Sequence, residues 1–202
     1  MLIHLPPNCS KSKFYEKLID DFRRAEKRAF YSLMENNPSV EERCKFDEIN
    51  AQDAHYFFSV YKGRVMSVVR LISSQKLNLV YDLLSPYFAP LPIKRDESLL
   101  EMNIFFLGNP LPLTSSILTL KFINLFIGVV KYGLRRGYKK IITAVSVIME
   151  ENFKLAGWPF TRLTDVNPLG DIPTVIGTLP ISEDILSILK STKKSYGVSY
   201  GN

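Results

Sequence analysis

The chain has 202 residues, enough for one domain of ordinary size or two small ones. Apolar residues make up 46% and charged residues 23% of it, which excludes a disordered, collagen-like or disulfide-scaffold protein. The 26 Lys and Arg against 20 Asp and Glu leave a net charge of +6, which favours an acidic partner but is too small to indicate nucleic acid.

The predicted elements begin with a helix over residues 14–34, where apolar residues recur at helical spacing until Pro38 breaks the pattern. Aromatic and β-branched runs then predict a hairpin at 55–61 and 65–72, a loop over 85–95 and a strand at 98–107. Further along we expect a helix over 114–136, a buried strand at 141–148, a short helix over 149–156, extended segments at 160–164 and 174–179, and a helix over 182–190.

This order of strands and helices is typical of a mixed α/β or α+β fold around one central sheet. The chain has no internal repeat and no low-complexity linker. We therefore expect residues 1–202 to form a single domain, with a frayed tail from about residue 191.

The sequence also predicts the compartment. Cys9 and Cys44 are too few for a disulfide framework, and the N-terminus lacks the pattern of a signal peptide. The most apolar stretch, 117–130, is shorter than the ~20 residues that a membrane span needs. We expect a cytoplasmic protein with no membrane span.

Three neighbouring strands each place polar side chains on an otherwise apolar face. These are Arg70 in the first, Glu101 and Asn103 in the second, and Thr143 in the third. A guanidinium or carboxylate among apolar side chains is costly unless it is paired. The pattern fits the floor of a ligand pocket with an Arg–Glu pair, but also a structural ion pair or an edge strand.

Acidic residues gather before the hairpin, at Asp47, Glu48 and Asp53. Acidic side chains in a loop are usually solvated. They could also hold the positive charge of a ligand or pair with Arg70.

Several segments occur in an order that is specific as a set: 46–48 (FDE), 55–57 (HYF), 68–72 (VVRLI), 100–106 (LEMNIFF), 137–138 (GY), 142–146 (ITAVS) and 156–158 (AGW). In this order and spacing they resemble the acyl-homoserine-lactone synthases, the autoinducer synthases of bacterial quorum sensing. The resemblance covers about residues 22–188.

The resemblance implies an α/β (α+β) fold like that of the GNAT acetyltransferases. A mixed, mostly antiparallel sheet flanked by helices would be splayed between two central strands, with the acyl donor in the split. It implies an enzyme that moves an acyl chain from acyl carrier protein or coenzyme A to the amine of S-adenosylmethionine. The product would close to an N-acyl-homoserine lactone and expel methylthioadenosine, with no bound cofactor.

The catalytic residues that the resemblance implies are Asp47, Arg70 and Glu101. The two carboxylates would face the cationic acceptor, and Arg70 would organise them. Burial of Glu101 on an apolar face should raise its pKa, which suits a general base acting directly or through a water. Pairing with Arg70 would oppose that rise.

The resemblance also implies substrate-binding residues, which are Asn103, Phe105, Phe106, Thr143, Ser146, Arg24, Arg28 and Phe30. Backbone amides around Phe105 and Phe106 would hold the thioester carbonyl. The hydroxyl of Thr143 could bind an oxidised acyl C3, although Thr is also an ordinary strand former.

Four positions depart from the family pattern. In the first helix the family has R-x3-F-x5-W, and aligning Phe30 with its Phe puts Glu26 at the Arg and Asn36 at the Trp. Asn50 stands at the second loop aspartate. Ile104 stands at the Arg of the E-x-[SG]-R motif.

An acid-free basic block follows the long helix and consists of Lys131, Arg135, Arg136, Lys139 and Lys140. It could steer an acidic acyl carrier protein to the enzyme. Cations are also favoured at a helix C-terminus by the macrodipole alone.

Two alternatives remain open. The four departures favour an N-acyltransferase of the GNAT type that acts on another amine. A non-catalytic relative that binds a carrier protein is the other. His4 and His55 lack the spacing of metal ligands, so we expect no metal site.

Overall fold

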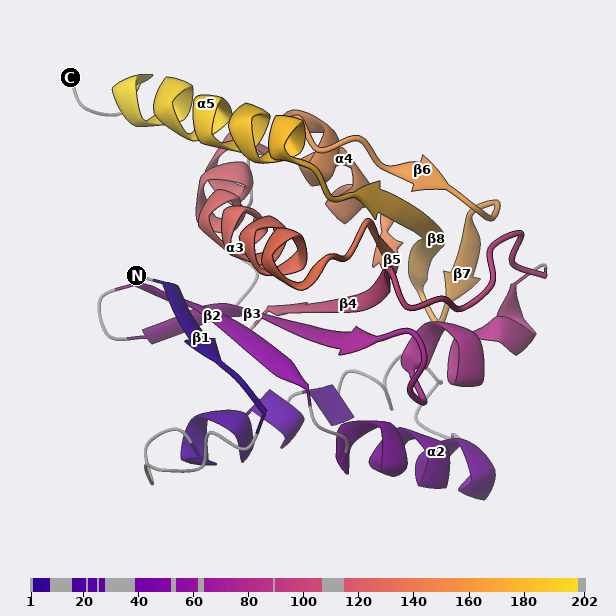
Figure 1. The fold of residues 1–202 in the computed structure, drawn as a ribbon. Helices are drawn as coiled ribbons and strands as arrows, with labels where there is room; N and C mark the ends of the chain where they lie inside the picture. The colour runs from indigo at the N-terminus through magenta and orange to yellow at the C-terminus, as the bar shows by residue number, and fades with distance from the viewer. Residues whose placement is uncertain are drawn as a thin grey trace.

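A mixed sheet of eight strands runs through the molecule, with helices on both of its faces (Figure 1). The computed structural model describes residues 2–7, 16–20, 22–24, 26–27, 39–51, 54–61, 64–88, 90–106 and 115–199. The strand order is β1-β2-β3-β4-β5-β8-β6, and β7 pairs with β8. The strands are β1 (Leu2–Leu5), β2 (His55–Tyr61), β3 (Arg64–Ser73), β4 (Leu99–Phe106), β5 (Lys140–Ser146), β6 (Thr161–Arg162), β7 (Asn167–Leu169) and β8 (Ile172–Pro180).

All neighbouring strands are antiparallel except β4 and β5, which are parallel. Parallel neighbours need a crossover, and the helix α3 (Ser115–Arg136) lies between these two strands in the chain.

The sheet splays open between β4 and β5. The two strands pair at only three positions, the last of which is Glu101 with Ile142. Beyond that point the described pairing joins β4 to β3 and β5 to β8. This divergence confirms the predicted splay, and Glu101 lies at its apex.

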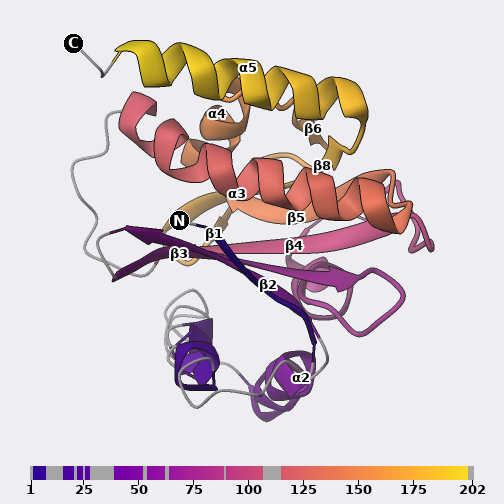
Figure 2. The same ribbon diagram turned by 60° about the vertical axis from the view of Figure 1, so that its left-hand side comes forward.

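Two helical layers cover the sheet (Figure 2). On one face lie α3, α4 (Val147–Leu155) and α5 (Glu183–Ser199). They bury inward side chains of the central strands, such as Val69, Met102 and Ile141, in the largest apolar cluster of the described residues. We call this the α3 face. On the opposite face lie the N-terminal helical residues and α2 (Val40–Ala51), with η1 (Leu79–Leu84) and η2 (Ser85–Tyr87). We call this the α2 face.

The predicted strands 55–61, 65–72 and 174–179 are confirmed as β2, β3 and β8, and the strand 98–107 is confirmed as β4 up to Phe106, since residue 107 lies outside the described residues. The strand predicted over 141–148 is confirmed as β5 up to Ser146, but residues 147 and 148 belong to α4. The loop predicted around Asp47 is wrong, because these residues lie in α2. Ser39 and Glu42 explain the helix. Each side chain accepts a hydrogen bond from the backbone N–H of the other, which forms a capping box.

Three further elements differ from expectation. The strand β1 is short and belongs to the sheet through its antiparallel pairing with β2. The helix η1 precedes the predicted loop, in a stretch where no element was expected, and it is anchored by Asn78, whose side chain accepts a hydrogen bond from the N–H of Tyr81. The last helix, α5, continues to Ser199, well beyond the predicted end at residue 190.

A histidine pair joins β1 to β2 and gives a prediction for acid stability. Nε2 of His4 lies 3.1 Å from Nδ1 of His55, and His4 stacks on Phe57. Burial is the main cause that lowers the pKa of both imidazoles, of His55 to about 4, and the charge of Arg136 lowers both further. Stability that depends on the neutral pair is therefore present above the ordinary pKa of 6.5 and is lost as the pH falls toward 4.

We expect His55→Phe, which keeps a ring beside Tyr132, to flatten this acid loss of stability. Urea denaturation on both sides of the window measures it. Parallel pH curves for wild type and variant would show that the pair does not titrate on unfolding.

Candidate functional site

Glu101 is a fully buried carboxylate with three hydrogen-bond donors. Its Oε1 accepts from the N–H of Leu79 and from Nδ2 of Asn103, both at 3.0 Å. Its Oε2 accepts from the N–H of Val80 at 2.7 Å. Leu79 and Val80 form the first turn of η1, so Glu101 ties this element to the apex of the splay.

Burial raises the pKa of Glu101, while the Val80 hydrogen bond and the charge of Arg70 oppose the rise without cancelling it. Each carboxylate oxygen has two lone pairs. Oε1 already has two donors, so Oε2 is the oxygen that keeps a lone pair for a proton or a substrate N–H. Glu101 is therefore held in place by hydrogen bonds, and its Oε2 can still accept one more.

Arg70 lies next to Asn103 in the register of β3 and β4 and is buried on the α2 face. Its Nη1 lies 3.5 Å from Oε1 of Glu26. The charge of Arg70 also acts on Glu101. The structure thus brings Arg70, Glu101 and Asn103 together on one face, and it adds Glu26 as an ion-pair partner of the guanidinium.

In the sequence, Glu26 stands out only as a departure from the family pattern. It is 2% exposed, and its Oε2 has no hydrogen-bond partner within the described residues. A signal for its burial was available. Glu26 follows Phe22 by four residues, so both lie on the same face of the first helix, and Phe22 is fully buried.

Burial raises the pKa of Glu26 to about 7, and the charge of Glu101 adds to the rise against the opposing charge of Arg70. Since the folded pKa lies above its ordinary value of 4.5, the folded protein loses stability as the pH rises from 4.5 to about 7. The loss is about 3 kcal/mol when converted at ~1.4 kcal/mol for each pH unit.

We expect Glu26→Gln to remove this loss, so that the variant gains stability relative to wild type as the pH rises through the window. Urea denaturation across the window measures the difference. The matched control is Glu48→Gln, an exposed position on α2. An equal pH dependence in wild type and Glu26→Gln would contradict the assignment.

Asp47 lies apart from this buried group. It is exposed on α2, and its Oδ1 lies 2.9 Å from Nζ of Lys27. The alternative that it pairs with Arg70 is therefore wrong for this structure, since Lys27 is its partner. Its predicted catalytic role is untested.

Thr143 and Ser146 lie along β5. Thr143 shares the α3 face with Ile141 and Val145, which is the opposite face from Glu101. Its Oγ1 is buried without a hydrogen-bond partner in the described part of the chain. Ser146 caps α4, because its Oγ accepts from the N–H of Met149 at 3.3 Å.

The remaining predicted residues are placed less fully. Arg24 is exposed, and the backbone of Phe105 and Phe106 lies in β4 beyond the apex. Arg28 and Phe30 lie outside the described residues, as does Asn36. Of the other departures, Asn50 lies in α2 and Ile104 packs against the α3-face cluster.

The basic block is exposed at all five positions. Lys131, Arg135 and Arg136 lie in the last turns of α3, and Lys139 and Lys140 lie at the start of β5. This is the end of the sheet where β4 and β5 are paired. The block therefore lies at the closed end of the splay.

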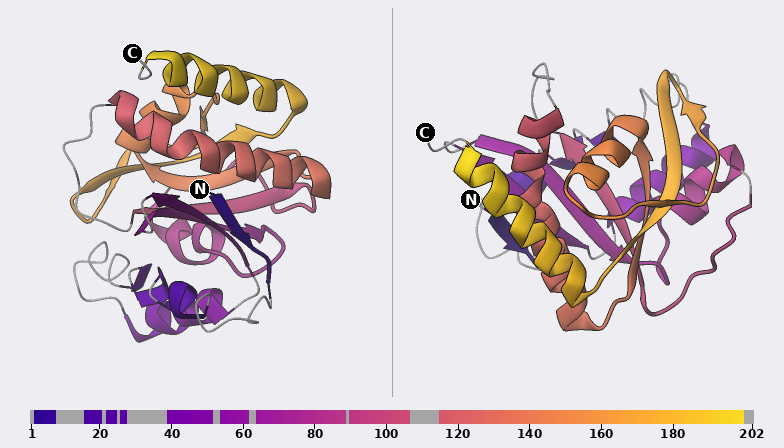
Figure 3. Two further views of the ribbon diagram at one scale, coloured as in Figure 1. Left: turned by 90° about the vertical axis from the view of Figure 1, so that its left-hand side faces the viewer. Right: turned by 90° about the horizontal axis from the view of Figure 1, so that it is seen from above.

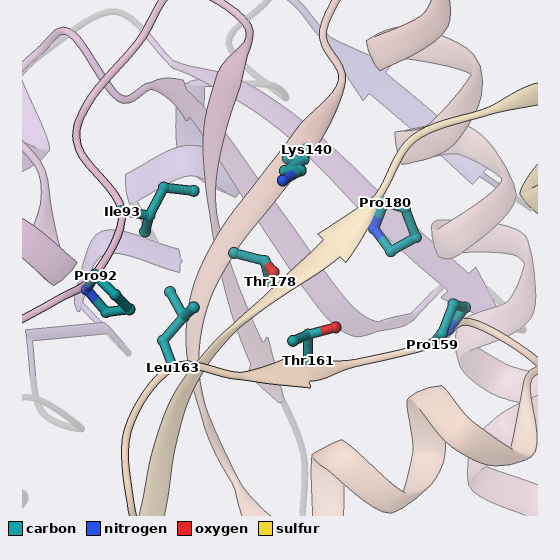
Figure 4. Close-up of a pocket in the computed structure, with 8 residues that line it drawn as sticks. All are labelled: Pro92, Ile93, Lys140, Pro159, Thr161, Leu163, Thr178 and Pro180. Carbon is teal, nitrogen blue, oxygen red and sulfur yellow. The ribbon is translucent and has the colours of Figure 1, made fainter.

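A hollow of about 400 Å³ lies at the same end of β5 and β8 (Figure 4). Its lining is mostly apolar, with Lys140 as the charged member. The lining residues are Pro92, Ile93, Lys140, Pro159, Thr161, Leu163, Thr178 and Pro180. The hollow shares no residue with the buried group around Glu101.

Within the described ranges, no group of three or more His, Cys, Asp or Glu side chains is placed so that it could hold a metal ion. No helix of the described residues has the length and hydropathy of a membrane span.

Comparison with known proteins gives a family. The profile of the family described as "Autoinducer synthase" matches residues 10–189. The chain is 27% identical over 142 residues to an acyl-homoserine-lactone synthase of Rhizobium radiobacter, covering 69% of this chain and 66% of that protein. It is 25% identical over 171 residues to one of Agrobacterium fabrum, covering 82% of this chain and 80% of the relative.

Solved structures show the same fold. The AHL synthase LasI superposes with a TM-score of 0.72 at 15% identity, over 95% of each chain. The CoA-dependent acyl-homoserine lactone synthase BjaI, solved with SAM and isopentyl-CoA, gives 0.69 at 17% identity, over 98% of this chain and 89% of that chain. The chain therefore belongs to the autoinducer synthase family, and it has the mixed, splayed-sheet fold of that family's structures.

Proposed function

We propose that this protein is an acyl-homoserine-lactone synthase. It transfers an acyl chain from a thioester to the amine of S-adenosylmethionine, and the product closes to a lactone and releases methylthioadenosine. The observation that carries the proposal, within a chain of this family, is the buried Glu101 at the apex where β4 and β5 separate.

Aminolysis of a thioester needs a neutral amine and hydrogen-bond donors for the developing oxyanion. Glu101 is suited to the first need, since its raised pKa and the free lone pair on Oε2 let it take a proton from the amine. Beyond the apex, the edge of β4 that faces β5 is not used in the described pairing of these two strands. Its backbone N–H groups are available for the thioester carbonyl.

The acceptor is a cation, and the site around Arg70 carries two buried carboxylates, Glu26 and Glu101. An acidic excess favours binding of an ammonium or sulfonium group. The same excess keeps a second candidate open, which is transfer to another amine, because Glu26 stands where the resemblance expects an arginine.

The acyl donor could be carried by acyl carrier protein or by coenzyme A. BjaI is described as CoA-dependent. The exposed basic block supports the carrier protein, since its charge complements an acidic partner. We place the reaction in the cytoplasm and in a single domain, as expected from the sequence.

Charge reversal tests the docking role of the basic block. We expect Lys131→Glu with Arg135→Glu to raise the KM for acyl carrier protein by about tenfold at low salt and to leave the KM for acyl-coenzyme A unchanged. The matched control is Lys190→Glu, an exposed position on α5. An unchanged KM for acyl carrier protein would contradict the docking role. The basic residues would then be explained by the preference for cations at the C-terminus of a helix.

Steady-state assays test the proposed function. We expect the purified protein to release methylthioadenosine from S-adenosylmethionine when given an acyl thioester of suitable length. Consumption of thioester with another amine and without methylthioadenosine would favour the second candidate. Binding of acyl carrier protein without turnover of any thioester would indicate a non-catalytic relative.

A further inference from the structure

Two buried polar atoms on the α3 face have no hydrogen-bond partner among the described residues. They are Oγ1 of Thr143 and Oδ1 of Asn152, in side chains that are 0% and 2% exposed. A buried polar atom without a partner destabilises a fold by about 1–3 kcal/mol. Such atoms call for an explanation, and a bound ligand is one.

Both atoms belong to elements that border the splay. Thr143 is the first residue of β5 beyond its last pair with β4. Asn152 lies in α4, which follows β5 directly and packs against β5, α3 and β8. Figure 3 shows α4 between α3 and β8 when the molecule is seen from above. The α3 face of the splay thus carries one hydroxyl on its strand and one amide on the helix over it.

The orientation of the Asn152 amide is fixed by its other end. Its Nδ2 donates to the backbone oxygen of Ile148 at 2.8 Å. The flipped amide would set two oxygens against each other, so Oδ1 is the atom left over. An amide oxygen only accepts hydrogen bonds, and the missing partner must therefore be a donor.

We propose that Asn152 is a specificity-determining residue that selects an acyl chain bearing a hydroxyl group, a conclusion that rests on the proposed function. A hydroxyl on the acyl chain can donate a hydrogen bond to Oδ1 of Asn152. An oxo group or an unsubstituted chain has no such donor. Thr143 can donate to or accept from the same oxygen, because its hydroxyl has both capacities. The inferred donor class is a hydroxyacyl thioester.

Competition between thioesters of one chain length tests the inference. We expect kcat/KM for the hydroxyacyl chain to exceed that for the oxo and the unsubstituted chain by about tenfold or more, as is usual where a site is built to hold a polar group. In Asn152→Leu this preference should fall by about tenfold, through loss of the hydroxyacyl substrate and not of the unsubstituted one.

The matched control is Ser67→Ala. Its Oγ is also buried without a partner in the described chain, but it lies on β3, two strands from β5. This variant should leave the preference unchanged. Thermal unfolding of both variants checks folding, and Asn152→Leu should be at least as stable as wild type because it removes an unpaired polar atom.

The outcomes separate the two claims. Release of methylthioadenosine with unsubstituted and hydroxyacyl chains at equal kcat/KM, unchanged in Asn152→Leu, overturns the inference and leaves the proposed function intact. If no thioester of any kind leads to release of methylthioadenosine, both the inference and the proposed function are overturned.

Discussion

Glu101→Gln is expected to lower kcat by 100-fold or more and to destabilise the fold by about 2 kcal/mol. The glutamine keeps one oxygen but replaces the other with an NH₂ group. That group meets a backbone N–H of η1, at Leu79 or Val80, where a carboxylate oxygen accepts a hydrogen bond in the wild type. The proton acceptor on Oε2 is lost at the same time. Steady-state release of methylthioadenosine and urea denaturation measure the two effects.

Glu150→Gln is the matched control for Glu101→Gln. Glu150 is also a buried carboxylate, but its partners are the side chains of Arg162 and Lys154, and it does not contact η1 or Asn103 through any hydrogen bond of the described residues. We expect a similar loss of stability in this variant with kcat retained. If both variants lose activity in proportion to stability, Glu101 has no chemical role.

Arg70→Met is expected to destabilise the protein by about 3 kcal/mol at neutral pH and to abolish activity. It leaves Glu26 buried without the ion pair that the structure shows. The pKa of Glu26 should then rise further, since the charge of Arg70 is what lowers it. Because Glu26 then becomes neutral, the loss of stability should lie near the lower end of what removal of one partner of a buried ion pair usually costs.

A double-mutant cycle tests this coupling. We expect Arg70→Met with Glu26→Leu to recover at least half of the stability lost in Arg70→Met, because both charges leave the interior. Activity should stay lost, since the guanidinium whose charge acts on Glu101 is absent. A double variant that is no more stable than Arg70→Met would mean that Glu26 is not the partner that matters.

The sequence predicts well what depends on alternation within one strand. Glu101 and Asn103 lie on one face of β4 as expected, because they are two residues apart. The face of one strand relative to the next depends on register, which no local pattern contains. Glu101 pairs with Ile142 in β5, and this pairing puts Thr143 on the opposite face. Alternation within each strand alone groups Thr143 with Arg70 and Glu101.

Contacts between residues far apart in the chain are the second feature that the sequence does not predict. The donors to Glu101 come from Leu79 and Val80, which lie more than 20 residues away and act through their backbone. The residue type does not show which backbone N–H group will donate a hydrogen bond to a distant side chain. The contacts that position Glu101 could therefore not be predicted. The helix α2 is different, because the Ser39 and Glu42 capping box that starts it is visible in the sequence.

The central claim is that the apex of the splay, with Glu101, is the reaction centre of an acyl-homoserine-lactone synthase. The most direct measurement is mass-spectrometric detection of lactone and methylthioadenosine formed together from S-adenosylmethionine and an acyl thioester. We predict that wild type and Glu150→Gln each form lactone and methylthioadenosine in equal amounts. Glu101→Gln should form both products at least 100-fold more slowly. Thioester turnover without methylthioadenosine, or equal rates in all three proteins, would contradict the claim.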